Sequence, residues 1–231
     1  TKDLTIKELT TDISYSNKNE DGNYQLVIKK GSIYNLNLKD SVINLRHGVS
    51  GIKLNTQMQT KGKLDFLQIK KISNLLSLNI NSFNNINGKI NLKTKIDFTL
   101  GNKFKLKDLI YSTDGKIDYL EVYRKDDKFI KTYLPDYNAK FFLKDTIINF
   151  SSSKFAHNLK LNGFIKTKDS FDSIKIDEIY NKKNKKFDIK GSISLTNSFV
   201  QFSKLNYSKK SGEEAELKFD TSFVIKKKLL Y

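Results

Sequence analysis

The sequence predicts an all-β protein: an elongated, curved antiparallel sheet that forms an open groove, built of repeated long hairpins with at most two short helices. The first observation is the stretch from Ile86 to Leu100, where apolar or small residues hold every even position and Asn, Lys, Asp or Thr every odd one. A period of two is typical of a strand with one buried and one solvated face. The second is that turn-forming residues separate similar segments along the chain. The third is a glycine that recurs two positions before an isoleucine.

Alternating apolar residues in the N-terminal part predict several short strands. They lie at 4–15, 24–28, 34–38, 43–45 and 52–58. Turn-forming residues between these segments predict chain reversals in the cluster 17–23, at Lys30-Gly31 and at Lys39-Asp40-Ser41.

Residues 64–76 interrupt the alternation. Their apolar residues are spaced by a mixture of three and four positions, which is compatible with a short helix as well as with an irregular strand. We therefore treat residues 1–231 as a single repetitive β region with a possible short helical break near 64–76. The abrupt patterned ends lead us to expect a fragment of a longer chain.

The longest predicted hairpin follows this break. Its first strand ends at the turn Gly101-Asn102-Lys103, and 104–107 resumes the alternation. We expect Ile90, Leu92, Ile96 and Phe98 on one face of the sheet and Lys89, Asn91, Lys93 and Lys95 on the other. Lys144-Asp145-Thr146 predicts another turn. Later alternating segments lie at 139–143, 148–150, 159–167, 174–176, 187–195 and 215–225.

The recurring glycines are Gly31, Gly88, Gly115, Gly163 and Gly191. Glycine inside a strand often marks a bulge, a bend or a close approach of two backbones. The functional interpretation is a sheet that these glycines allow to curve. The alternative is a set of unrelated glycines next to turns.

Composition limits the possible functions. The net charge is +17, and only Arg46 and Arg124 among the 42 basic residues are arginines, so the rest are lysines. Because sequence-specific nucleic-acid recognition relies on bidentate arginine contacts, this charge fits a solvated lysine face or attraction to anionic lipid headgroups better than nucleic-acid binding. The absence of cysteine excludes disulfides and thiolate metal sites. The sequence contains no run of about 18 apolar residues, so it predicts no membrane-spanning helix.

Residues with catalytic chemistry are sparse. His47 and His157 each stand apart from other ligand or nucleophile residues and are expected to be surface histidines in loops. The acidic pairs Asp126-Asp127 and Glu213-Glu214 are typical of solvated loops. No glycine-rich phosphate loop is present. We therefore expect a protein that is not an enzyme and that has no cofactor and no metal site.

The order of alternating strands and turn motifs in this sequence resembles that of the AsmA-like proteins of Gram-negative bacteria, in particular the members with large repetitive β regions. The likeness covers roughly residues 25–225. It rests on Tyr133-Leu134-Pro135-Asp136 followed by the alternating stretch 139–148, on the Lys-Asp turns, and on 187–195 followed by 199–205. The motifs are of low specificity, and the chain lacks the family's N-terminal membrane helix, which a fragment would explain.

The resemblance implies a curved sheet whose apolar groove carries phospholipid between the inner and outer membranes. It implies a periplasmic protein tethered to the inner membrane by a segment outside this chain, with phospholipid acyl chains as ligand. From the residues themselves we expect lysines at strand edges to hold headgroup phosphates, and no nucleic-acid partner. An uncovered apolar sheet face leads to the same expectation, because it must curl, pair or bind something apolar. The alternative is a structural or adhesive β-solenoid or fibre module with no ligand. The candidate groove residues are Ile90, Leu92, Ile96, Phe98, Phe141, Leu143, Leu161, Ile189, Ile193, Leu217 and Phe219.

Overall fold

The structure is a computed structural model that describes residues 6–18, 21–48, 51–75, 83–101, 105–124, 140–166, 170–202 and 206–224. Strands make up most of these residues, and the one described helix is α1 (Phe66–Leu75). The strands are β1 (Lys7–Lys18), β2 (Asp21–Ile33), β3 (Leu36–Gly48), β4 (Gly51–Leu64), β5 (Phe83–Leu100), β6 (Leu106–Arg124), β7 (Lys140–Ser152), β8 (Ala156–Lys166), β9 (Phe171–Asn181), β10 (Lys186–Ser194), β11 (Val200–Phe202), β12 (Tyr207–Lys209) and β13 (Glu216–Val224).

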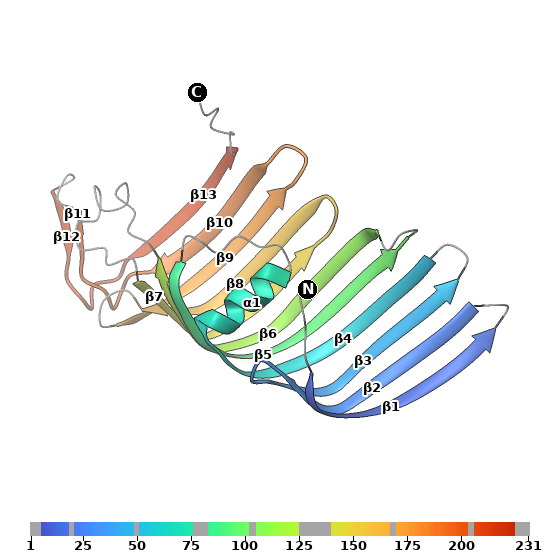
Figure 1. The fold of residues 1–231 in the computed structure, drawn as a ribbon. Helices are drawn as coiled ribbons and strands as arrows, with labels where there is room; N and C mark the ends of the chain where they lie inside the picture. Colours follow the sequence, from blue (N-terminus) through green and yellow to red (C-terminus); the bar gives the residue numbers. More distant parts are fainter. Residues whose placement is uncertain are drawn as a thin grey trace.

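Eleven of these strands form a single open sheet in the order β1-β2-β3-β4-β5-β6-β7-β8-β9-β10-β13. Every neighbouring pair is antiparallel, so the sheet is a continuous meander. The strands bend along their length, and the sheet curls into a trough (Figure 1). The predicted curved, antiparallel all-β fold is confirmed, and the meander differs from a β-solenoid.

The register assigns each strand residue to one of two faces. In the pair β4–β5, Thr60 lies opposite Leu92 and Lys61 lies opposite Asn91. We call the face that carries Leu92 the inner face and the face that carries Asn91 the outer face. The four apolar and four polar residues of β5 separate between these faces as predicted, because the β4–β5 register continues without a shift from Ile52 to Leu64.

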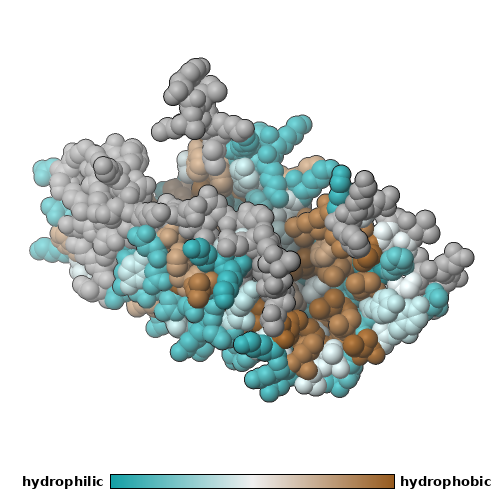
Figure 2. Space-filling view, in the orientation of Figure 1, coloured by the Kyte–Doolittle hydropathy of each residue, from teal (hydrophilic) through white to brown (hydrophobic). Residues whose placement is uncertain are grey.

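The inner face lies on the concave side of the trough. Although the sheet has a single layer, Ile28 and Leu38 on this face are each only 1% exposed. Leu36, Ile90 and Ile117 form a buried cluster on the same face, against which Leu64, Leu92, Leu120 and Ile148 pack. Figure 2 shows the apolar side chains gathered in one broad area of the hollow, with hydrophilic residues around it. The curvature therefore buries apolar surface that a flat sheet would leave in water.

Helix α1 lies on the concave side of the sheet (Figure 1). It begins with a reciprocal capping box: the backbone N–H of Gln68 donates to the Asp65 carboxylate at 2.8 Å, and the backbone N–H of Asp65 donates to the Gln68 side chain at 3.1 Å. The helix falls within the residues where the apolar spacing mixes three and four. No helix in the described part of the chain is long and apolar enough to cross a membrane.

The recurring glycines all lie inside strands on the inner face, and Gly31 is the one that lies near a turn, two residues before the end of β2. Gly31, Gly115 and Gly191 belong to one row of paired residues that crosses the sheet. Gly62 and Gly163 belong to the adjacent row. A Cβ atom on Gly163 would stand 2.3 Å from the Thr146 Oγ1, and one on Gly115 would stand 2.2 Å from the Asn91 carbonyl oxygen. The neighbouring strands thus approach too closely for a side chain along the line of the bend.

Three predicted chain reversals are wrong. Lys30-Gly31 lies inside β2, Lys39-Asp40-Ser41 inside β3, and Lys144-Asp145-Thr146 inside β7. Asp40 and Asp145 have positive φ angles of 49° and 47°, and the register shifts beside both. They are therefore β-bulges, which use the same left-handed backbone that Asp adopts in turns.

A true two-residue reversal occurs at Tyr34-Asn35, where both residues have positive φ, as a type I′ hairpin turn requires. The described residues 195–202 and 206–215 lie outside the main sheet, between β10 and β13, and include the small pair β11–β12. The Leu-Pro segment 133–136 that contributed to the family resemblance lies outside the described residues, as does most of the charged segment that follows β6.

Candidate functional site

The inner face of the trough is the candidate site, and the register places all eleven predicted groove residues on it. One row of paired residues joins Leu92, Leu161 and Phe219 across the sheet, and the adjacent row joins Ile90, Ile193 and Leu217. The remaining members occupy parallel rows on the same face. They are Ile96 and Phe98 of β5, Phe141 and Leu143 of β7, and Ile189 of β10.

Burial differs along this set. Ile90 and Leu143 are buried, whereas most of the others are only partly buried, and Leu217 on the last strand is 48% exposed. In the first strand, Ile13 and Tyr15 also lie on the inner face and are exposed. The apolar lining thus runs from one edge strand of the sheet to the other, and part of it stays accessible.

Charge is sorted between the two faces with little overlap. The lysines of the main sheet's described strands occupy outer-face positions, where several form ion pairs across strands. The Nζ–carboxylate distances are 2.6 Å for Lys29–Asp12, 2.7 Å for Lys116–Asp145 and 2.9 Å for Lys190–Asp220. Hydrogen bonding to Asp145 raises the pKa of Lys116 and lowers the pKa of Asp145, so both groups remain charged. Because these pairs are exposed to solvent, they contribute little to stability.

A row of aromatic side chains follows one rim of the inner face. Its ring centroids are 5.6 Å apart for Tyr111–Phe150, 5.9 Å for Phe150–His157 and 5.7 Å for His157–Tyr180. The row continues with 4.4 Å for Tyr180–Phe187 and 5.1 Å for Phe187–Phe223. Aromatic rings combine an apolar body with a polarised face, which suits the boundary between acyl chains and water.

A cavity of about 650 Å³ opens at this rim. Tyr111, Ser152, His157 and Lys182 line it, together with Lys107, Lys154 and one carboxylate, Asp108. The Lys182 ammonium donates to the Ser152 hydroxyl at 3.3 Å and to the Ser153 carbonyl. Burial, followed by the nearby positive charge of Lys182, lowers the pKa of His157. The cavity therefore presents lysine ammonium groups beside a histidine that stays neutral at pH 7.

His157 differs from the expected surface loop residue. It lies in β8 on the inner face and is partly buried between Phe150 and Tyr180. Its Nδ1 atom is buried and has no hydrogen-bond partner among the described residues. His47 lies near the end of β3 and is exposed. No local pattern distinguishes the two histidines, because the rings that enclose His157 come from other strands.

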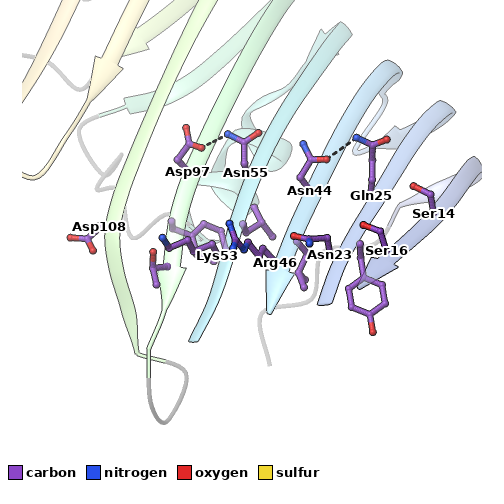
Figure 3. A pocket seen from close by; sticks show the side chains of 15 residues that line it. Ser14, Ser16, Asn23, Gln25, Asn44, Arg46, Lys53, Asn55, Asp97 and Asp108 are labelled. Atoms are coloured by element: carbon purple, nitrogen blue, oxygen red, sulfur yellow. Dashed lines mark hydrogen bonds between the residues drawn. The ribbon is translucent and has the colours of Figure 1, made fainter. Parts of the chain in front are cut away.

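A second, polar depression of about 700 Å³ lies on the outer face of β1 to β6. Its row of polar side chains includes Gln25, Asn44, Asn55 and Asp97. Figure 3 shows the Gln25 amide donating to Asn44 and the Asn55 amide donating to Asp97. Since these groups largely satisfy one another, the depression offers fewer free hydrogen-bonding groups than its composition suggests.

The described residues contain no group of three or more His, Asp or Glu side chains arranged to hold a metal ion. No protein-family model, no curated protein and no solved structure matches the chain. The features of the inner face itself therefore carry the functional argument.

Proposed function

We propose that this chain is a non-catalytic lipid-binding module whose inner face holds the acyl chains of phospholipids. The observation that carries the proposal is the continuous apolar lining, which crosses the open sheet without a lysine among its described strand residues. Ten interstrand spacings of about 4.8 Å give the lining a length of roughly 48 Å along the groove, from one edge strand to the other. This exceeds the ~30 Å hydrocarbon thickness of a whole bilayer, so the groove has room for more than one acyl chain.

The arrangement of polar groups supports the same function. Aromatic rings border the groove at one rim, and the cavity beside them offers Lys107, Lys154 and Lys182 to a headgroup phosphate. In the cellular setting that the AsmA-like resemblance implies, the module would be part of a periplasmic path for phospholipid between the inner and outer membranes. A segment outside this chain would attach it to the inner membrane.

The proposal can be tested by placing a charge on the acyl-chain path. Phe98→Asp puts a carboxylate on the inner face, outside the buried cluster of Leu36, Ile90 and Ile117. An unpaired charge in apolar surroundings costs several kcal/mol, so we expect bound phospholipid to decrease strongly. Asn91→Asp adds the same charge on the outer face and is the matched control.

The measurement pairs native mass spectrometry of co-purified lipid with thermal unfolding for each variant. We expect the wild type and Asn91→Asp to carry phospholipid, and Phe98→Asp to remain folded with little lipid, because an open groove admits water to solvate the carboxylate. A wild-type protein that carries no lipid, together with a Phe98→Asp variant that unfolds, would instead indicate a dry structural module.

A further inference from the structure

The inner face carries two acidic residues among its described strand positions, Asp172 and Glu178, and they have different surroundings. Asp172 is 1% exposed and fully engaged, because its carboxylate accepts hydrogen bonds from the backbone N–H of Asn197 at 2.9 Å and from the Ser198 hydroxyl. It anchors the 195–215 segment. Glu178 makes no hydrogen bond and no ion pair within the described residues. Glu178 is partly exposed, so water in the open groove can solvate its carboxylate and a cationic ligand can reach it.

The neighbours of Glu178 on the inner face are almost entirely apolar. Leu159 of β8 pairs with it on one side and Ile189 of β10 on the other. Ile176 and Tyr180 flank it two positions away along β9. Burial raises the pKa of the Glu178 carboxyl, which reflects the cost of holding its charge in this place. No lysine of the described main-sheet strands shares this face, so Glu178 is open to a cationic group supplied by a ligand.

Aromatic rings stand beside this carboxylate. Tyr180 and Phe187 stack at 4.4 Å between ring centroids, and Phe187 stacks on Phe223 at 5.1 Å. Because Tyr180 also stacks on His157, these rings cover one another's faces and form an apolar wall beside Glu178. Such a wall lowers the local polarity and strengthens the attraction between the carboxylate and an ammonium group. The rim cavity with Lys154 and Lys182 lies on the neighbouring strands and supplies the opposite charge. The two parts together match a headgroup that contains both an amine and a phosphate.

We infer that Glu178, beside the apolar wall of Tyr180 and Phe187, binds the ammonium group of an amine-bearing phospholipid, and that the lysines of the rim cavity bind its phosphate. This inference rests on the proposed lipid-binding function and adds a headgroup preference to it. Phospholipids that carry an ethanolamine amine are favoured over those with a glycerol headgroup, which offer no cation to Glu178.

The test loads the purified chain from vesicles of equimolar phosphatidylethanolamine and phosphatidylglycerol and determines the bound lipids by mass spectrometry. We expect the wild type to be enriched in phosphatidylethanolamine, and Glu178→Gln to lose that enrichment by about tenfold, which corresponds to about 1.4 kcal/mol. Asp177→Asn is the matched control. It removes one negative charge at the adjacent position on the outer face, where Asp177 pairs with Lys160 at 3.4 Å, and should keep the wild-type ratio.

A second measurement leaves the protein unchanged. Acetylation of the ethanolamine amine removes its positive charge, and the wild type should then lose its preference over phosphatidylglycerol. Equal ratios for the wild type and Glu178→Gln, or an undiminished preference for the acetylated lipid, would overturn the ammonium site while leaving lipid binding intact. A wild type that takes up neither lipid would overturn the proposed function itself.

Discussion

Gly163→Ala tests whether close approach of neighbouring strands on the inner face is what requires glycine there. A Cβ atom at position 163 would lie 2.3 Å from the Oγ1, 2.5 Å from the Cα and 2.7 Å from the Cβ of Thr146. Thr146 is completely buried. A rotamer change can move the hydroxyl but leaves the Cα and Cβ atoms in place, so β7 and β8 would have to separate.

The cost can be worked out from two opposing effects. Overpacking of a tight site costs about 1–3 kcal/mol, and the upper end applies here because two of the three close approaches involve atoms fixed to the backbone. The reduced freedom of the unfolded chain returns about 0.4–1 kcal/mol. We therefore expect a net loss of about 2 kcal/mol in the free energy of unfolding. For a chain of this size, this corresponds to a decrease in melting temperature of roughly 4–8 °C.

Gly22→Ala is the matched control. A Cβ atom there would meet its nearest neighbour, the Tyr15 ring, at 3.5 Å, which is an ordinary van der Waals distance, so stability should stay equal or rise by up to about 1 kcal/mol. Urea unfolding of both variants measures the difference. Adding Thr146→Ala to Gly163→Ala should not restore stability, because the backbone of residue 146 would still be too close to the new methyl group. Wild-type stability for Gly163→Ala, or full rescue by Thr146→Ala, would refute the steric reasoning.

Three further predictions concern one bulge and two titratable groups of the inner face. Ser41→Ala should lower the free energy of unfolding by about 1–3 kcal/mol, measured by urea unfolding. The reason is that the fully buried hydroxyl accepts a hydrogen bond from the Gln59 N–H at 3.0 Å and donates one to the Lys39 carbonyl at 3.2 Å. A loss below about 0.5 kcal/mol would contradict this reasoning. The raised pKa of Glu178 means that its protonated form is favoured in the folded state, so stability should fall as pH rises from about 4.5 through the folded-state pKa, and Glu178→Gln should remove this decrease in melting temperature. The lowered pKa of His157 acts in the opposite direction, since stability should fall as pH drops below about 6.5, and His157→Gln should remove that decrease.

The facing of the strands could be predicted because it depends on local alternation. Once β5 is a strand, its period of two places Leu92 and Asn91 on opposite faces without any knowledge of its neighbours. The bulges at Asp40 and Asp145 could not be predicted in the same way. In a Lys-Asp-Ser or Lys-Asp-Thr triplet, the Asp can adopt the left-handed backbone conformation either at a chain reversal or at a bulge within a strand. Only the pairing with another strand distinguishes the two.

The candidate site was predictable in its apolar part and not in its polar part. The groove residues follow from alternation, whereas the aromatic rim joins Tyr111, His157, Tyr180 and Phe223 from four different strands. No spacing in the sequence brings these residues together, since their proximity depends on the register of each intervening pair. Glu178 was missed for a related reason: a glutamate in an alternating strand has no special meaning until the register places it on the apolar face.

The glycine rows and the bulges together explain how a single sheet can keep its apolar face concave. Gly115 and Gly191 remove side chains from the line where neighbouring strands approach closest, while Asp40 and Asp145 lengthen one strand of each pair and bend it. If large side chains replaced these glycines, the strands would separate and Leu38 and Ile90 would gain exposure to water. The lysines of the outer face oppose closure from the other side, because a second layer packed there would have to bury their charges. Curvature toward the inner face is therefore the arrangement that buries apolar surface and keeps the charges solvated, and its by-product is a groove open at both edge strands.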